Sequence, residues 1–505
     1  MNDNGAQRKK PPVPRSQLGC GVKNNGMNAP PPKQLLRRFY GYDDFRPGQA
    51  EIIEHVLAGG HAMVVMPTGM GKSLCYQIPA LSSADDDRSI VLVLSPLIAL
   101  MQDQVDSLLR RGIDASFINS SLDRATRLAR YDALARGQYK ILFVTPERFR
   151  KDDFCEALSR RSVRLLAIDE AHCVSQWGHD FRPDYTRVAE IRASIGDPTT
   201  LALTATATAE CRQDIYRQIG IDASQVKLFH QGIDRPNLRL DVIPVYDEEE
   251  KRNQLRDILR DPEYRSGSAI VYFSLIKTLQ RFSDHLLSEG IDHVSYHGDL
   301  PRHHRRRVQD EFMSGDADLV LATNAFGMGI DKEDIRMVVH AETPGSIESY
   351  YQEIGRAGRD GEPSRCVWLY AQEDLMTQMQ FIEWSNPDAA FYTRLYQLMA
   401  EHGEQCRAFG LDWMNGQLQR RSKHDHRIAT AISILDRHGV VAGPRPPQCF
   451  EVRAPLPARL QDDEQLAEKK RRDQQRLYAM VQFAAEEGDR KPFLNRYFAD
   501  PAAPG

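Results

Sequence analysis

A glycine-rich turn between an apolar run and a helix start constrains the fold of this chain more than any other feature. The turn is Met66-Pro-Thr-Gly-Met-Gly-Lys-Ser73, and the apolar run His61–Val65 precedes it. Backbone N–H groups of such a turn, together with the helix dipole, form a cradle for phosphate. Lys72 can reach the β- and γ-phosphates, and the Ser73 hydroxyl can bind Mg²⁺. The residues expected to bind phosphate are Thr68, Gly69, Met70, Gly71, Lys72 and Ser73.

A pair of adjacent acids supports this interpretation. Met66 stands where the motif usually has glycine, so a plain turn ahead of an ordinary helix is the alternative. However, the apolar run 164–168 leads directly into Asp169 and Glu170 about a hundred residues downstream, a spacing that allows intervening βα units in one sheet. Asp169 would bind Mg²⁺, and Glu170 would act as general base toward the attacking water.

Size and charge limit the remaining possibilities. The chain has 505 residues, and a chain of this length forms roughly two to four domains. Its net charge is −4, so a nucleic-acid site must be a local groove and not a general basic field. None of its eight cysteines forms a Cys-x-x-Cys pair, which is typical of cytosolic proteins. No apolar run approaches membrane-spanning length, and we expect no membrane partner.

Hydrophobic patterning predicts an α/β fold with two parallel sheets in tandem. Residues 1–33 are rich in Pro, Gly, Asn and Lys and are expected to be a disordered tail. Short apolar runs alternate with helical patterns over 34–232, and again over 233–375. The strands expected in the first lobe are 61–66, 89–94, 140–145, 164–168 and 200–204. Those expected in the second are 269–273, 293–296, 319–323, 337–340 and 366–370.

The C-terminal region, residues 376–505, has a different pattern. Helical spacing is seen over Ala389–Glu401 and 428–439, and two short apolar runs then flank a Pro-rich turn. This pattern predicts a mainly helical region with a winged-helix-like insert. A charged helix is expected over 466–487, with the basic run Lys469-Lys-Arg-Arg472 on a solvated face.

The segment Asp169-Glu-Ala-His-Cys-Val-Ser-Gln-Trp-Gly-His-Asp-Phe-Arg-Pro183 resembles the RecQ family of superfamily 2 DNA helicases. Four other segments resemble family motifs in the same order, and together the resemblance spans roughly 34–372. They are Tyr42-Asp-Asp-Phe-Arg-Pro-Gly-Gln49, Leu203-Thr-Ala-Thr-Ala207, Ala322-Thr-Asn-Ala-Phe-Gly-Met-Gly-Ile330 and Gln352-Glu-Ile-Gly-Arg-Ala-Gly-Arg-Asp360. The resemblance implies two RecA-like lobes with ATP bound between them.

The same resemblance implies further residues of the ATP site. Tyr42 would stack on adenine, Gln49 would pair with its edge, and Arg46 would help to hold the nucleotide. Arg356 and Arg359 would reach across from the second lobe to the γ-phosphate, with Arg359 as the arginine finger. Hydrolysis would then depend on closure of the two lobes.

A DNA track is also implied by the resemblance. Trp177, Phe181 and Arg182 lie in the loop that, in the family, couples strand binding to hydrolysis, and stacking on the aromatics would be tolerant of sequence. Packing of these aromatics inside the lobe is the alternative. Six residues at strand ends resemble family residues that contact phosphates, although each alone could be a helix cap: Ser95, Asn119, Arg148, Ser274, His297 and Thr323.

One departure from the family concerns zinc. RecQ proteins usually carry a four-cysteine zinc module after the second lobe, but Asp489 stands where its first cysteine is expected. No Cys-x-x-Cys follows, so no zinc is expected. The sequence therefore supports ATP hydrolysis more directly than strand separation.

The sequence therefore predicts an ATP- and Mg²⁺-dependent 3′–5′ DNA helicase or translocase acting in DNA repair and recombination. Polarity, DNA preference and pathway come from the resemblance alone. Single-stranded, forked or junction DNA is the expected partner, in a bacterial-type cytoplasm and associated with the nucleoid. Two alternatives remain: a DEAH-like RNA-dependent ATPase, and a binding or strand-annealing module that uses ATP as a switch.

Overall fold

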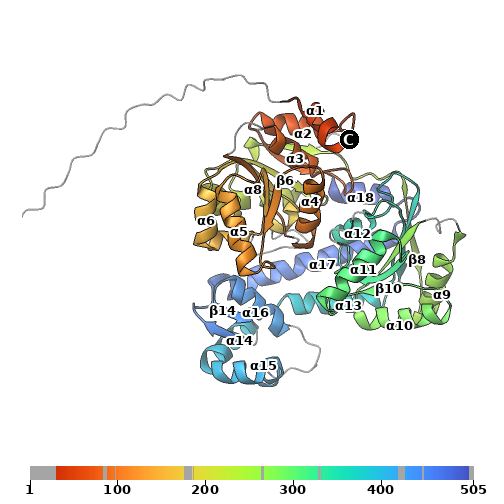
Figure 1. Cartoon of the computed structure of the whole chain (residues 1–505). Helices are drawn as coiled ribbons and strands as arrows, with labels where there is room; N and C mark the ends of the chain where they lie inside the picture. The colour runs from red at the N-terminus through yellow and green to blue at the C-terminus, as the bar shows by residue number, and fades with distance from the viewer. Residues whose placement is uncertain are drawn as a thin grey trace, which may run out of the picture.

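Two parallel β-sheets follow one another along the chain (Figure 1). The computed structural model describes residues 30–82, 88–96, 98–175, 185, 187–262, 267–327, 330, 332–418, 427–445 and 449–499. The first sheet has seven strands in the order β3-β4-β2-β5-β6-β1-β7. Their bounds are β1 His61–Val65, β2 Ser89–Leu94, β3 Ala115–Ile118, β4 Ile141–Val144, β5 Ser162–Ile168, β6 Thr199–Thr204 and β7 Val226–His230.

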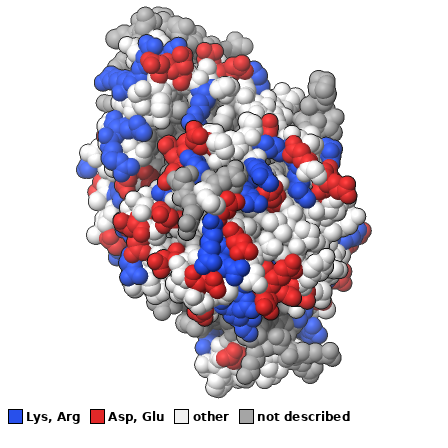
Figure 2. Space-filling view, turned by 90° about the vertical axis from the view of Figure 1, so that its right-hand side faces the viewer, with Lys and Arg blue, Asp and Glu red and all other residues white. Residues whose placement is uncertain are grey.

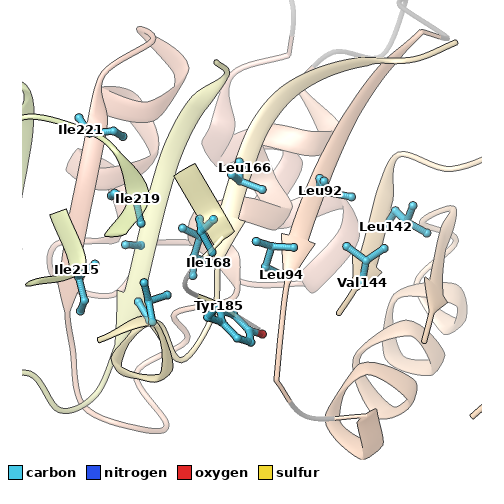
Figure 3. Packing of buried hydrophobic residues seen from close by; sticks show 14 of the residues in the cluster. Leu92, Leu94, Leu142, Val144, Leu166, Ile168, Tyr185, Ile215, Ile219 and Ile221 are labelled. Carbon is cyan, nitrogen blue, oxygen red and sulfur yellow. The ribbon is translucent and has the colours of Figure 1, made fainter. Parts of the chain in front are cut away.

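Helices cover both faces of the first sheet because its central strands are apolar on both sides. Alternate residues of β2 enter two different cores: Leu92 and Leu94 one, Val91 and Val93 the other. Figure 3 shows the first core, where Ile215 and Ile219 pack over the strands. The helices are α1 Pro32–Tyr40, α2 Gln49–Leu57, α3 Leu74–Leu81, α4 Ile98–Arg110, α5 Arg124–Ala135, η1 Pro146–Arg150, α6 Asp152–Ser159, η2 Ala171–Val174, α7 Val188–Ser194, α8 Ala209–Ile219 and η4 Ala223–Gln225.

The second sheet has six parallel strands in the order β10-β11-β9-β12-β13-β8. Its strands are β8 Leu238–Pro244, β9 Ser268–Phe273, β10 Val294–Tyr296, β11 Leu319–Thr323, β12 Ile335–His340 and β13 Ser364–Tyr370. Its helices are α9 Glu248–Leu259, α10 Ile276–Ser288, α11 Arg302–Ser314 and α12 Ile347–Ile354. The two-lobed α/β fold class is thereby confirmed.

The C-terminal region contains a small helical unit with a β-hairpin. The elements of the whole region are α13 Asp374–Ser385, α14 Ala389–Glu401, α15 Gly403–Gln417, α16 Arg427–Arg437, β14 Val441–Arg445, β15 Cys449–Val452, η6 Ala458–Leu460, α17 Asp463–Ala485 and α18 Lys491–Phe498, and the inserted unit is the part from α14 to η6. The strands β14 and β15 are antiparallel, and α14, α15 and α16 share a core with them. This arrangement matches the expected winged-helix-like insert.

The last two helices pack on the second lobe, and Leu466 at the start of α17 also packs against the core of the inserted unit. Met480 and Phe483 of α17, with Leu494 and Phe498 of α18, are buried in the core that lies beneath β13. Figure 1 shows α17 running from the inserted unit toward the second lobe. The helix expected over 466–487 corresponds to α17, whose C-terminal half is buried in this core, beyond the charged run that was expected on a solvated face.

Three further features are plain among the described residues. Cys75, Cys173, Cys211, Cys366 and Cys406 are free and buried, as expected of small apolar side chains, whereas Cys155 is exposed. No helix in the described ranges is long and apolar enough to span a bilayer. Within the same ranges, no group of three or more His, Cys, Asp or Glu side chains is arranged to hold a metal ion.

Candidate nucleotide site and nucleic-acid interface

The chemistry-bearing residues of the first lobe gather at the carboxyl ends of its parallel strands. Residues 66–73 follow β1, Asp169 follows β5, and Thr204 ends the strand β6 that lies between them. Ser95, Asn119 and Arg148 follow the neighbouring strands β2, β3 and β4. Ligands of open parallel sheets bind at this edge. One half of the edge thus carries the expected nucleotide residues, and the other half carries expected nucleic-acid residues.

The phosphate loop needs glycine at two positions. Gly69 and Gly71 have φ values of +81° and +78°, which side chains other than glycine rarely adopt. Gln49 holds this loop: its Nε2 donates to the carbonyls of Met70 and Gly71 at 3.0 Å each. A Cβ at Gly71 would lie 2.6 Å from that nitrogen, so the loop conformation and the Gln49 contact depend on each other.

The three residues expected to hold the adenine base differ in burial and in hydrogen-bond partners. Gln49 is buried, and its Oε1 accepts the Arg46 backbone N–H at 2.9 Å, so its amide already has protein partners at both ends. The Arg46 guanidinium donates to the Gly69 carbonyl. Tyr42 is 55% exposed.

Lys72, Asp169 and Glu170 form one electrostatic group. The Lys72 ammonium donates to the Met66 carbonyl at 3.0 Å. Burial lowers the pKa of Lys72, and the carboxylates of Glu170 and Asp169 oppose this. Burial and the Glu170 charge raise the pKa of Asp169 to about 7, while Lys72 opposes the shift. Carboxylate and hydroxyl oxygens are the ligands that Mg²⁺ prefers, and Asp169 and Ser73 fit that donor set.

Glu170 is held in an uncommon backbone conformation, with φ +49° and ψ +50°. A non-glycine residue in this region stores strain and is often found at functional sites. The carboxylate lies 3.3 Å from Nδ1 of the buried His172, and that nitrogen lies 3.0 Å from the Thr204 hydroxyl. The Thr204 hydroxyl in turn accepts the Thr206 N–H at 3.1 Å. The acidic motif and the segment 203–207 are thereby joined through His172.

The second lobe brings one of its two expected arginines to the phosphate loop. A Cβ at Gly69 would lie 3.2 Å from Cγ of Arg359, so this side chain lies directly against the loop. The Thr68 hydroxyl also donates to the Gly355 carbonyl at 3.0 Å across the lobe boundary. Arg356 is buried and donates to the Gly327 carbonyl within its own lobe. Of the pair, Arg359 is thus the one placed beside the phosphate loop.

The expected phosphate-contacting residues of the first lobe are all buried. Ser95 is 1% exposed, Asn119 0% and Arg148 8%. The Asn119 carboxamide oxygen accepts the backbone N–H of Ser121 at 3.0 Å and its hydroxyl at 2.7 Å. With these contacts Asn119 stabilises the turn after β3, and it is Asp123, not Asn119, that caps the following helix.

In the second lobe, the expected contacts lie at three adjacent strand ends. Ser274 follows β9, His297 follows β10, and Thr323 is the last residue of β11. The Ser274 hydroxyl already donates to the Thr343 carbonyl at 3.3 Å and accepts from Gln378 at 3.0 Å. The Glu342 carboxylate also accepts the Ser274 N–H at 2.7 Å, so a carboxylate already lies at the start of α10. Ser274 therefore has protein partners where a strand phosphate was expected.

The aromatic residues of the loop after the acidic motif, Trp177 and Phe181, lie with Arg182 outside the described residues. The start of that loop is described. The buried Ser175 donates to Oδ2 of Asp214, on α8, at 2.8 Å. The described start of the loop therefore ends at an anchored residue, Ser175.

His172, Thr204 and Arg235 were missed as individual residues by the sequence analysis. His172 and Thr204 lie within recognised motifs, so motif position was the available signal. Arg235 lies in the connector between the lobes, where only its charge beside Pro236 marked it.

On one side of the molecule, surface charge gives no additional guide to a binding face. Figure 2 shows positive and negative residues intermingled over the side of the molecule where α9 and α10 lie. Many of them form pairs, such as Arg281 with Glu248 at 2.7 Å and Arg260 with Glu289 at 3.3 Å. A nucleic-acid site is therefore better sought at the strand ends than on this face.

Comparisons with known proteins agree with this geometry. A DEAD/DEAH box helicase family model matches residues 46–214, and a helicase conserved C-terminal domain model matches residues 250–361. The chain is 43% identical to the ATP-dependent DNA helicase RecQ of Haemophilus influenzae, over 67% of this chain and 53% of that protein. It is 38% identical to the protein of the same name from Synechocystis, over 67% of this chain and 71% of that protein.

The relatives differ from this chain in length. The Bacillus subtilis ATP-dependent DNA helicase RecQ is 42% identical over 70% of this chain, but only 58% of that protein is covered. This chain thus spans little more than half the length of the Haemophilus and Bacillus relatives.

Solved structures share the fold. MrfA bound to DNA and AMPPNP matches with a TM-score of 0.57 and 22% identity, over 70% of this chain and 52% of that chain. Dbp5 of S. cerevisiae bound to RNA and ADP BeF3 matches with a TM-score of 0.55 and 18% identity, over 69% of this chain and 90% of that chain. At these identities the likeness concerns the fold alone.

Proposed function

This chain belongs to the RecQ family of ATP-dependent DNA helicases, and on that premise we propose that it hydrolyses ATP to move 3′–5′ along single-stranded DNA and to separate strands in DNA repair and recombination. The observation that carries the proposal is the convergence of three segments: the phosphate loop, the Asp169–Glu170 pair and Arg359. Because Arg359 comes from the other lobe, hydrolysis requires both lobes together.

The roles of the residues follow from their positions. Residues 68–73 would cradle the phosphates of ATP, with Lys72 turning from the Met66 carbonyl toward the β- and γ-phosphates. Ser73 and Asp169 would hold Mg²⁺, which neutralises phosphate charge when bound. Glu170 accepts a proton from the attacking water, and Arg359 stabilises the charge that develops on the transferred phosphoryl group. Arg356 would keep its neighbour in place from within the second lobe.

The nucleotide base would be held outside the phosphate loop. Tyr42 is exposed and would stack on the base. Gln49 and Arg46 already contact the loop through Met70, Gly71 and Gly69, so they would link recognition of the base to the loop's conformation.

The DNA strand would lie across the strand ends of both lobes. Ser95, Asn119, Arg148, Ser274, His297 and Thr323 sit at corresponding edges of the two sheets, where polar groups bind the sugar-phosphate backbone without reading bases. Trp177 and Phe181 would stack on bases, with Arg182 beside them. We further propose a bacterial-type cytoplasmic location with the nucleoid, from the DNA substrate and the bacterial relatives. We also propose the domain division 34–232, 233–375 and 376–505, without a zinc site.

The test is ATP turnover of the purified chain alone, with single-stranded DNA and with RNA, alongside unwinding of a forked duplex. We expect DNA to stimulate turnover more than RNA does, and the fork to open from a 3′ tail. Stimulation by RNA alone would favour the RNA-dependent ATPase. Negligible turnover with DNA bound would favour a module that uses ATP as a switch.

A further inference from the structure

The connector between the two sheets carries an arginine that contacts both lobes. Arg235 lies between β7 and β8. One terminal nitrogen donates to the carbonyls of Ala357 and Gly358 at 2.8 Å each. The other donates to the Thr68 carbonyl at 3.3 Å and, more weakly, to that of Gly355 at 3.5 Å. One guanidinium therefore binds the phosphate loop and three carbonyls of the second lobe.

The arrangement suits an arginine in particular. A guanidinium presents several N–H donors in a rigid planar fork, whereas an ammonium is a compact point charge. The acceptors lie at and just beyond the C-terminal end of α12, whose C-cap residue is Gly355. A positive charge at this end is favourable because of the helix dipole.

The segment that Arg235 binds is the one that carries the two expected catalytic arginines. The segment reads Gly355-Arg-Ala-Gly-Arg359, so the three residues whose carbonyls bind Arg235 lie on both sides of Arg356 and directly before Arg359. Asn237 binds the same segment at the Gly358 and Glu362 carbonyls, at 2.8 and 2.9 Å. In the part of the chain that the structure describes, Asn237 makes no hydrogen bond to the phosphate loop, whereas Arg235 makes one. Variants of the two residues therefore distinguish two roles. Asn237 contacts only the segment, whereas Arg235 also joins the segment to the other lobe.

We propose that Arg235 is a positioning residue that holds the segment 355–359 against the phosphate loop, so that the Arg359 side chain stays aligned with the γ-phosphate. Arg235 acts through backbone carbonyls and does not itself touch the nucleotide. The inference rests on the proposed ATP hydrolysis for its kinetic consequence, but the contact between the lobes is a structural claim of its own.

The kinetic test compares Arg235→Ala, Asn237→Ala and Arg239→Ala at saturating single-stranded DNA. Arg239 is a largely exposed arginine on β8 and serves as the control. We expect Arg235→Ala to lower kcat by about 10- to 100-fold, as displacement by an ångström can do, with the KM for ATP little changed. Asn237→Ala should lower kcat less, and Arg239→Ala should leave it unchanged. A raised KM with normal kcat in Arg235→Ala would overturn the proposal.

The structural test does not depend on turnover. Backbone hydrogen exchange is measured on peptides covering 66–73 and 352–362 in the full chain. Arg235→Ala should speed exchange in both peptides, and Asn237→Ala only in the second. If Arg235→Ala leaves the 66–73 peptide unchanged, the link between lobes is wrong, whether or not the wild type hydrolyses ATP. Wild-type turnover separately tests the proposed function. Should Arg235→Ala fail to fold, Arg235→Lys keeps the charge without the fork and should shift both readouts in the same direction.

Discussion

Glu170 combines a strained backbone with a carboxylate close to His172 and Lys72. We predict that Glu170→Gln binds nucleotide normally and loses hydrolysis by orders of magnitude. The amide has nearly the same shape, but it cannot accept a proton from water. Nucleotide affinity by fluorescence titration and turnover with DNA measure the two effects. Loss of affinity in the variant would indicate instead that Glu170 supports the shape of the site.

Gly71 allows the contact between Gln49 and the phosphate loop. We predict that Gly71→Ala weakens ATP binding, because the added Cβ would meet the Gln49 amide at 2.6 Å. Gly112→Ala is a matched control, since its φ of +74° is similar and no atom lies within 4 Å of the added Cβ.

Both substitutions should cost about 1–2 kcal/mol of stability from the positive φ alone. Thermal melts measure this shared cost, and nucleotide titration measures the difference. Equal nucleotide affinity in the two variants would contradict a role for the Gln49 contact.

At the scale of elements, α17 belongs energetically to the second lobe. Phe483 is 0% exposed and its ring lies 5.2 Å from that of Tyr350 and 6.4 Å from that of Trp368. We predict that Phe483→Ala costs about 3–5 kcal/mol of unfolding free energy. Tyr478 on the same helix is 62% exposed, so Tyr478→Ala should change stability by less than about 0.5 kcal/mol. Chemical denaturation of both variants checks this, and equal losses would place α17 outside the lobe's cooperative core.

The sequence identified the interior strands well and missed three at the edges. β1, β2, β9 and β11 lie within one residue of the expected ranges because continuous apolar runs mark strands buried on both faces. The missed strands, β3, β7 and β8, are all edge strands. β7 reads Val-Lys-Leu-Phe-His and β8 reads Leu-Arg-Leu-Asp-Val-Ile-Pro, so their polar residues interrupt the apolar run.

The site could be predicted as motifs but not as contacts. Gly69, Gly71 and Arg359 were expected from local patterns, and the structure brings them together. The contact of His172 with Thr204 and the contacts of Arg235 have no local pattern, because the partners lie far apart in sequence. Likewise, the charged run 469–472 gave no sign that the C-terminal half of the same helix is buried.

At the scale of the whole molecule, the bond between Thr68 and Gly355 makes the two lobes interdependent. We predict that a non-hydrolysable ATP analogue changes the affinity for single-stranded DNA by about 5- to 150-fold, the range of typical coupling energies. By linkage, DNA must change the affinity for the analogue by the same factor. Titrations in both orders test this, and independent binding of the two ligands would contradict closure of the lobes around both.

The inserted unit leaves and rejoins the second lobe at a single place. Asn386, after α13, donates to Asp473 of α17 at 2.9 Å and accepts from Lys469 at 2.6 Å, while the Ala389 N–H donates to Asp463 at 3.3 Å. The chain between these points is therefore an excursion with paired ends. Such a segment can be exchanged for another of different length or fold while the lobes keep their frame, since insertions are tolerated where both ends meet at a surface. For an engineer, this place in the chain is a site for grafting a reporter domain.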